Sequence, residues 1–484
     1  MVAASTVADL HAALQPVIDT AATPDIVPGG ALVLQPSEAR RRSGSHYTPR
    51  ELTEPIVRTA LEPILARLRG PGGEPPNPAA ILDLKVCDPA MGSGAFLVEA
   101  CRQLGDALLD AWRFHSSAPP MQACEDEVIV ARRLVARRCL YGVDRNPMAV
   151  DLAKVSLWLA TLAKEHPLTF VDHALRRGDS LVGLSQAQIE AFHWDTGAEP
   201  LQQGIETIEL RKCMVRVTEL RRRIRDAGHT VSDGDLRNWW NEARIEVAKV
   251  RLSGDLLIAA FFNGRKPKER ETKRIEYAGA IFEGEVERYR GWIDQRRGEE
   301  PPLAPFHWEI EFPEVFDRGS SEGRKASGPA PGFDAVVGNP PFAGKNSVAA
   351  GNVAVYPDWL KQAHAESHGN ADLVAHFFRR AFDLVRDRGV FGLIATNTIA
   401  QGDTRASGLR WICKHGGEIF SVRRRSSGRD WRPWWSACCT SGRARWRITS
   451  RSTAATWSAS PRSCFTAAVT TIRCVWRPTP ARAS

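Results

Sequence analysis

Apolar residues along this chain follow two alternating patterns: short continuous runs, and positions spaced three or four residues apart. Continuous runs are typical of buried strands, and the wider spacing is typical of helices with one buried face. Strands are predicted at residues 81–88, 140–144, 333–338 and 390–395, with another shortly before Gly178. Helices are predicted at 51–68, 95–111, 147–160 and 371–385. This order predicts an α/β fold, a doubly wound and mostly parallel sheet with helices on both faces.

Two stretches depart from this alternation. Residues 185–316 are rich in charge and follow a helical spacing, which predicts an inserted helical subdomain. Residues 1–45 hold a short helical pattern at Leu10, Leu14 and Val17, and this segment is too short for a separate catalytic domain. We therefore expect an N-terminal segment at 1–45, two halves of one sheet domain at 46–184 and 317–423, a helical insertion at 185–316, and a tail at 424–484.

Composition narrows the class of protein. The chain has 484 residues, of which 43% are hydrophobic, and its 10 cysteines are scattered without Cys-x-x-Cys pairs. We therefore expect reduced thiols and no structural metal. The longest uncharged apolar run, residues 256–262, is far shorter than the roughly 20 residues that a membrane span needs. With no basic and apolar leader visible, the expected location is the cytoplasm.

The net charge of +9 is unevenly distributed. Residues 424–484 contain 12 Arg and one Asp and carry +11, so residues 1–423 carry −2. This tail contains no Leu, Lys or Glu, and no amphipathic period can be found in it. Its composition is typical of a GC-rich gene translated out of frame, so we expect the frame to be lost near Arg424 and the tail to be disordered. The alternative is a genuine Arg/Trp-rich arm that binds nucleic acid; translation of the other two frames of the gene decides between them.

A glycine-containing loop follows the first predicted strand. It runs Asp88-Pro89-Ala90-Met91-Gly92-Ser93-Gly94-Ala95-Phe96. Gly92 and Gly94 allow a tight turn and a close approach of ligand to backbone, and Asp88 can accept hydrogen bonds from a ligand amine. Asp144 ends the next strand, where an acid suits the two hydroxyls of a ribose. It lies 50 residues beyond Gly94, whereas the NAD fingerprint expects about 20, so NAD is disfavoured. The sequence Gly178-Asp179-Ser180 offers a third acid, either for an adenine amino group or as part of a surface turn.

The most specific motif is Gly338-Asn339-Pro340-Pro341-Phe342, directly after an apolar strand. An exocyclic amine on a base is a poor nucleophile because its lone pair is delocalised into the ring. The Asn339 side-chain oxygen and the Pro340 carbonyl can accept its two hydrogens, and Phe342 offers a face on which an unstacked base can lie. A turn that merely ends the strand would explain the prolines, but not the aromatic residue or the upstream glycine loop.

These motifs, in the order Tyr47-Thr48-Pro49, residues 88–96, Asp144, Asp179 and residues 339–342, resemble the gamma-type N6-adenine DNA methyltransferases. Members of that family are modification subunits of restriction-modification and related phage-defence systems, and the resemblance covers about residues 45–423. It implies a Rossmann-like methyltransferase fold and S-adenosylmethionine as cofactor. Asn339, Pro340, Pro341 and Phe342 match the catalytic tetrad. The implied cofactor-binding residues are Tyr47, Thr48, Pro49, Asp88, Pro89, Ala90, Gly92, Gly94, Phe96, Asp144, Asp179 and Ser180.

The resemblance further implies double-stranded DNA with a flipped adenine as substrate, and restriction or specificity subunits as partners. Phe342 replaces the commoner Tyr, and Met91 stands where Cys or Ala is usual. The family places its target-recognition domain after the position of Asn397, where this chain soon turns into the arginine-rich tail. Two alternatives therefore stay open: methylation of an RNA base amine or a protein glutamine, and a catalytically silent remnant that binds cofactor or DNA. We expect no restriction nuclease in the same chain.

Overall fold

The computed structural model describes residue 6 and residues 48–120, 126–161, 171–198, 205–227, 231–282, 285, 289–299, 302–316, 331–344, 348, 351–425 and 434–441. The chain divides into two units, residues 1–42 and residues 43–484. The second unit contains all the elements discussed below. The helix expected around Leu10, Leu14 and Val17 lies outside the described residues.

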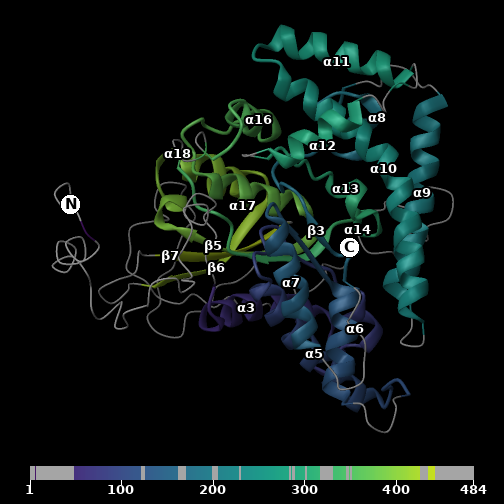
Figure 1. The fold of residues 1–484 in the computed structure, drawn as a ribbon. Coiled ribbons are helices and arrows are strands. Elements are labelled where there is room, and N and C mark those ends of the chain that lie inside the picture. Colours follow the sequence, from purple (N-terminus) through teal and green to yellow (C-terminus); the bar gives the residue numbers. More distant parts are fainter. Residues whose placement is uncertain are drawn as a thin grey trace, which may run out of the picture. The chain divides into compact units, whose positions relative to one another are not determined.

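A seven-stranded sheet forms the centre of the second unit (Figure 1). Its strand order is β3-β2-β1-β4-β5-β7-β6, and pairings among the first five strands are parallel. β7 is antiparallel to both β5 and β6. The strands are β1 (Val86–Asp88), β2 (Leu140–Asp144), β3 (Leu175–Arg177), β4 (Phe333–Gly338), β5 (Val385–Thr396), β6 (Gly417–Arg425) and β7 (Trp434–Ser441). The expected doubly wound, mostly parallel α/β fold is confirmed.

Helices cover both faces of this sheet. Those preceding the insertion are α3 (Arg50–Leu68), α4 (Pro78–Leu82), α5 (Ala95–His115), α6 (Glu127–Cys139) and α7 (Pro147–Ala160). Between β4 and β6 lie α16 (Tyr356–Ala363), α17 (Leu373–Leu384), η3 (Asn397–Ala400), α18 (Gly402–Arg405), η4 (Ala406–Arg410) and α19 (Trp411–Lys414). Local signals set several helix starts, since Asn146 caps α7 directly before Pro147 and Asp372 caps α17.

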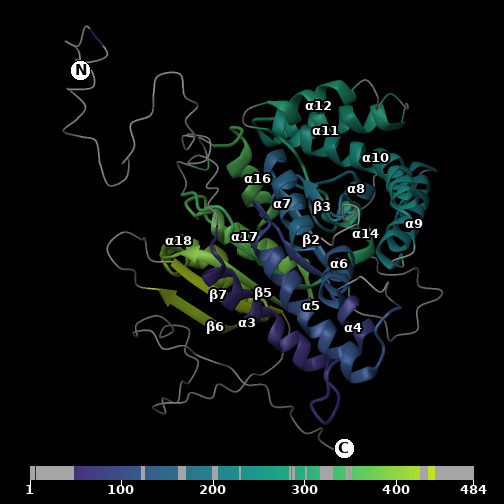
Figure 2. The ribbon, with the colours of Figure 1, turned by 60° about the horizontal axis from the view of Figure 1, so that its bottom comes forward.

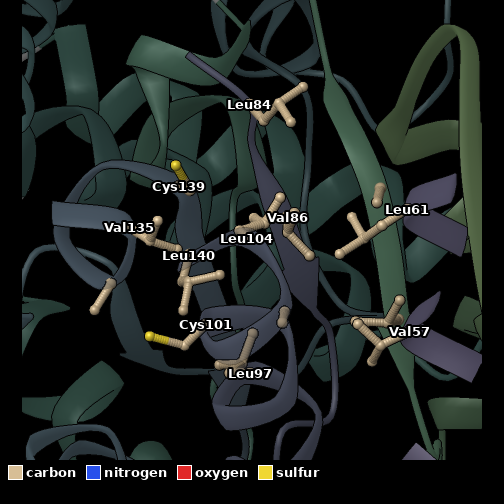
Figure 3. Close-up of a cluster of buried hydrophobic side chains, with 14 of the residues drawn as sticks. Val57, Leu61, Leu84, Val86, Leu97, Cys101, Leu104, Val135, Cys139 and Leu140 are labelled. Carbon is tan, nitrogen blue, oxygen red and sulfur yellow. The ribbon is translucent and has the colours of Figure 1, made fainter. Parts of the chain in front are cut away.

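Successive strand residues point to opposite faces, which creates two cores. Val86 and Leu140 belong to a cluster with apolar residues of α3, α5, α6 and α7, and Figure 3 shows side chains of α3, α5 and α6 gathered around these two strands. Their neighbours Cys87 and Tyr141 belong to a cluster on the other face, which includes residues of α13, α14 and α17. The period of two along each strand therefore produces a three-layer arrangement.

The segment between β3 and β4 is helical. It contains α8 (Gln186–Ala191), α9 (Ile205–Asp226), α10 (Asp233–Asn263), α11 (Pro267–Phe282), α12 (Arg290–Gly298), α13 (Trp308–Glu311) and α14 (Pro313–Phe316). Figures 1 and 2 show α9 to α12 grouped on the side of the sheet away from β6 and β7. Arg221 of α9 forms a buried bidentate ion pair with Glu314 of α14, with N–O distances of 2.7 and 3.0 Å, and so fastens the long α9 to the segment that leads back into the sheet.

Two sequence-based expectations need correction. The strand expected at 81–88 begins only at Val86, because Asn77 caps α4 and Pro78 starts it, so residues 78–82 are helical. The tail at 424–484 was expected to be disordered throughout, but residues 424 and 425 belong to β6 and residues 434–441 form β7. β7 pairs with β5 on one side and β6 on the other, and backbone pairing of this kind requires no amphipathic side-chain period. The rest of the tail lies outside the described residues.

Candidate active site

The predicted site residues converge at the carboxyl ends of the central strands. β1 lies between β2 and β4, so the chain moves outward through β2 and β3 and then returns to the other side of β1 as β4. Ligands of open α/β sheets bind at such a reversal of strand order. The pairing of Cys87 with Val336 brings the end of β1 beside the end of β4. Consistently, a Cβ atom at Gly338 would lie 2.6 Å from Asp88 Oδ1, so only glycine fits between this carboxylate and the motif that follows.

The glycine loop after β1 has the backbone conformation that its sequence suggested. Gly92 and Gly94 have φ angles of 53° and 83°, in the left-handed region that favours glycine. A Cβ at Gly94 would lie 3.2 Å from Ala153 of α7, whereas a Cβ at Gly92 would meet nothing within 4 Å. Gly94 thus permits close packing of the turn against α7, and Gly92 leaves open space beside the backbone at the start of α5.

Asp88 is a buried carboxyl group with one unused oxygen. Its side chain is 1% exposed, and Oδ1 accepts a 3.0 Å hydrogen bond from the Ala90 N–H. Oδ2 is shielded from solvent and has no donor among the described residues. Burial raises the pKa of Asp88 well above its usual value; the Ala90 hydrogen bond opposes this, and the negative charge of Asp144 adds to it. A ligand amine would supply a donor that the described residues do not.

Asp144 connects the second strand to the glycine loop. Its Oδ2 accepts a 2.9 Å hydrogen bond from the Gly92 N–H, and its Oδ1 accepts a 2.8 Å bond from the Asn146 N–H. Burial raises the pKa of Asp144, and these two hydrogen bonds oppose the shift. The acid expected to face a ribose therefore lies against the open backbone at Gly92.

The turn after β3 joins the same region. The Ser180 hydroxyl donates a 2.5 Å hydrogen bond to the Pro89 carbonyl. The buried Asp179 carboxylate accepts hydrogen bonds from the Leu181 N–H at 3.0 Å and from the Tyr356 hydroxyl, which lies 3.1 Å from each oxygen. The three predicted acids are thus linked through the loop that follows β1.

Asn339 is oriented by a residue from the beginning of the described chain. Its Nδ2 donates a 3.1 Å hydrogen bond to Oγ1 of Thr48, which is buried just before α3. This bond leaves the side-chain oxygen Oδ1 as an acceptor that is shielded from solvent and has no donor among the residues described. Pro49 caps α3, and Tyr47 lies outside the described residues.

Pro340, Pro341 and Phe342 follow in a segment that is neither helix nor strand. Phe342 is half-buried and packs against the cores on both faces of the sheet. The Ala343 N–H donates to Asp372 at 3.2 Å, and the Ala343 carbonyl accepts from the Leu373 N–H at 2.9 Å. The start of α17 therefore fixes the far end of the motif.

The structure buries one predicted residue in a hydrophobic core and brings two residues to the site that the sequence did not indicate. Phe96 is 2% exposed and belongs to the hydrophobic core around α5. Arg145 donates to the Asn352 side chain and to the Pro302 carbonyl, and lies 3.9 Å from Asp179. Arg145 could have been found from the sequence because it directly follows the predicted site residue Asp144. Tyr356 could not, because no sequence pattern relates it to Asp179.

The described residues contain no group of three or more His, Cys, Asp or Glu side chains that could hold a metal ion. Among these residues, no helix combines the length and the apolar composition that crossing a bilayer requires.

Comparison with known proteins agrees with this geometry. Residues 138–415 match the Eco57I restriction-modification methylase family, and residues 33–188 match the N-6 DNA Methylase family. A Methanocaldococcus jannaschii protein, named as a type II restriction enzyme and methyltransferase, is 24% identical over 423 residues. The match covers 76% of this chain and 33% of that relative, so the chain spans about a third of the relative's length.

Among solved structures, the type IIL restriction-modification enzyme MmeI in complex with DNA is 15% identical, with a TM-score of 0.37 and coverage of 86% of this chain and 39% of that chain. The ATP-dependent type ISP restriction-modification enzyme LlaBIII bound to DNA is 12% identical, with a TM-score of 0.39. The match covers 82% of this chain and 19% of that chain. The family matches confirm the expected kinship with N6-adenine DNA methyltransferases of restriction-modification systems. Since the larger match extends over more than half of the sequence, the chain belongs to the Eco57I restriction-modification methylase family.

Proposed function

We propose that this chain transfers a methyl group from S-adenosylmethionine to the N6 amino group of adenine in DNA, as the methylase part of a restriction-modification system. One observation carries the proposal: Asp88 Oδ2 and Asn339 Oδ1 are both shielded acceptors without donors in the described structure, at the ends of adjacent strands. Buried polar atoms are normally satisfied, so two unsatisfied acceptors at one sheet edge suit two ligand amino groups.

The residues at the end of β4 would hold the target amine. Asn339 Oδ1 accepts one of its hydrogens, and the Pro340 carbonyl accepts the other. Hydrogen bonds to these two acceptors would leave more electron density on the nitrogen and favour its pyramidal form, in which the lone pair leaves the ring conjugation and can attack an electrophile. Phe342 lies next in the chain, where its ring can stack on a base turned out of the duplex. The proton of the methylated nitrogen leaves after transfer, and no residue is assigned as a general base.

The residues at the ends of β1, β2 and β3 fit the cofactor. When bound, S-adenosylmethionine supplies the electrophilic methyl group of a sulfonium. Asp88 Oδ2 would accept from its amino group, Asp144 would face the ribose hydroxyls, and Asp179 would accept from the adenine amine. The open space beside Gly92 admits ligand atoms against the backbone. Thr48, Pro49, Pro89, Ala90, Gly94 and Ser180 would complete the surroundings of the cofactor.

This assignment divides the sheet domain into two functional halves. Residues 46–184 would bind the cofactor, residues 317–423 would hold the target base, and the helical insertion at 185–316 would separate them in the sequence. Restriction or specificity subunits would read the DNA sequence.

The test is transfer of a labelled methyl group from S-adenosylmethionine to DNA, RNA and total protein, followed by mass spectrometry of the hydrolysed product. The proposal expects N6-methyladenine in DNA. Asn339→Ala should abolish transfer and leave cofactor affinity within about twofold of the original, because Asn339 contacts the acceptor amine and not the cofactor.

Each other outcome contradicts a defined part of the proposal. Label in RNA or in a glutamine amide would change the substrate class. Cofactor binding without transfer to any substrate would identify a catalytically silent chain. Unchanged transfer by Asn339→Ala would overturn the role of the motif at 339–342.

A further inference from the structure

Among the residues that the structure describes, Tyr356 is a donor to the Asp179 carboxylate from the half of the chain that contains the motif at 339–342. It is the first residue of α16, its side chain is 3% exposed, and its hydroxyl oxygen is equidistant from the two carboxylate oxygens. Burial raises the pKa of this phenol well above its usual value, and the negative charge of Asp179 adds to the shift. The hydroxyl therefore keeps its proton and acts as a donor.

We propose that Tyr356 is a positioning residue for cofactor recognition, which fixes the Asp179 carboxylate in the orientation that accepts the amino group of the cofactor adenine. The inference rests on the proposed function and assigns the discrimination of the 6-amino group of the cofactor to the pair Tyr356–Asp179.

The distribution of donors around Asp179 supports this role. Oδ1 already accepts from the Leu181 N–H at 3.0 Å. Oδ2 shares the Tyr356 proton and has the Arg145 guanidinium at 3.9 Å, beyond hydrogen-bond distance. A hydroxyl placed symmetrically between two oxygens resists rotation of the carboxylate about its terminal bond. Oδ2 then retains the capacity to accept from a further N–H donor.

A separate bond holds α16 in place, so removal of the Tyr356 hydroxyl tests the carboxylate rather than the helix. Trp359 Nε1 donates a 2.9 Å hydrogen bond to the Leu181 carbonyl, and its side chain is 2% exposed. Tyr277 provides a matched control, because it is 5% exposed in the helical insertion and its hydroxyl accepts a 3.2 Å hydrogen bond from Asn263.

The experiment measures, by calorimetry, dissociation constants of the product S-adenosylhomocysteine and of its analogue S-inosylhomocysteine. The proteins compared are the original chain, Tyr356→Phe, Tyr277→Phe, Asp179→Asn and the double variant Tyr356→Phe/Asp179→Asn. S-adenosylhomocysteine carries the 6-amino donor, and S-inosylhomocysteine carries an oxygen acceptor in its place. The original chain and Tyr277→Phe should prefer the adenine compound. Tyr356→Phe should lose about tenfold of that preference, mainly through weaker binding of S-adenosylhomocysteine. The double variant should bind no more weakly than Asp179→Asn alone, because Tyr356 acts through Asp179.

If folded Tyr356→Phe keeps the preference for the adenine compound, the inference about Tyr356 is wrong and the proposed function stands. If the original chain binds neither compound, both the inference and the proposed function are wrong. If Tyr356→Phe weakens the binding of both compounds equally, Tyr356 has a purely structural role, and the inference is also overturned. If Tyr356→Phe does not fold, 3-fluorotyrosine at position 356 keeps the hydroxyl and nearly the same shape but makes it a stronger donor. The preference must then change, and an unchanged value overturns the inference.

Discussion

Thr48 and Asn339 are joined by a 3.1 Å hydrogen bond although 291 residues separate them in the sequence. The bond uses the amide nitrogen of Asn339 and so determines which way its oxygen faces. Thr48→Val preserves the shape of residue 48 but removes this acceptor. We expect kcat for methyl transfer to fall about tenfold, because the Asn339 amide can then rotate. The KM for S-adenosylmethionine should change less.

Steady-state kinetics with labelled cofactor check this prediction. Thr53→Val is a suitable control, since Thr53 is also buried, and its hydroxyl donates to the Arg50 carbonyl of its own helix. A rise in the KM for S-adenosylmethionine at constant kcat would show that Thr48 acts through the cofactor alone and does not orient Asn339.

Asp88 should lower the free energy of unfolding of the ligand-free protein, although it should strengthen the binding of the cofactor. Its pKa is higher in the folded than in the unfolded chain, so the folded chain takes up the proton more readily. The resulting stability is present at low pH and is lost as pH rises from the ordinary carboxyl pKa of about 3.9 through the raised value. Asp88→Asn removes this dependence. We expect it to be more stable than the original by about 1 kcal/mol at pH 7, and to bind S-adenosylmethionine at least tenfold more weakly.

Urea unfolding at several pH values, together with cofactor titration, measures both effects. Asp110→Asn on the exposed face of α5 removes the same chemical group elsewhere and should leave cofactor affinity unchanged. Lower stability of Asp88→Asn at pH 7 would mean that the carboxylate has a donor in the free protein.

Glu314 should be essential for docking of the insertion. Its carboxylate and the Arg221 guanidinium are 0% and 1% exposed, so Glu314→Gln leaves a buried guanidinium without its countercharge. We expect a loss of about 3–5 kcal/mol in the free energy of unfolding. Glu242→Gln in the exposed pair with Arg216 should cost far less, because solvent screens an exposed ion pair. Chemical denaturation measures the free energy of unfolding of both variants. Similar losses would show that the buried Arg221–Glu314 pair does not hold the insertion in place.

β7 should be required for the sheet. A chain that ends at residue 425 lacks the strand that pairs with β5 and β6, whereas a chain that ends at residue 441 retains it. We expect the shorter chain to unfold at a temperature at least several degrees lower, or to aggregate through the open edge of β5. Differential scanning calorimetry measures the unfolding temperatures of the two chains. Equal temperatures would show that β7 adds no stability.

Local patterns were sufficient to predict most of the sheet domain. β2 and β4 have the predicted bounds, and the order of strands and helices gave the doubly wound fold. The sequence also placed Asp88, Asp144, Asp179 and Asn339 at strand ends, where the structure brings them together. These successes share a cause, because strand period and turn chemistry are encoded within a few residues.

The remaining features depend on contacts between distant parts of the chain. β7 could not be predicted because its backbone partners, and not its own side-chain period, define it. The bond from Tyr356 to Asp179 spans 177 residues and has no local signature. Phe96 was assigned to the cofactor from its place in a motif, but it lies on the side of α5 that faces the core.

The position of β7 between β5 and β6 has a consequence for biosynthesis. Strands made earlier by the ribosome can pair as they emerge, but β6 has no direct partner in β5 and must wait for residues 434–441. Until those residues leave the exit tunnel, the nascent polypeptide displays the unpaired amide and carbonyl groups of β5. An unpaired strand edge of this kind can pair with another chain, so a chaperone bound to β5 before residues 434–441 emerge would protect the nascent chain from aggregation.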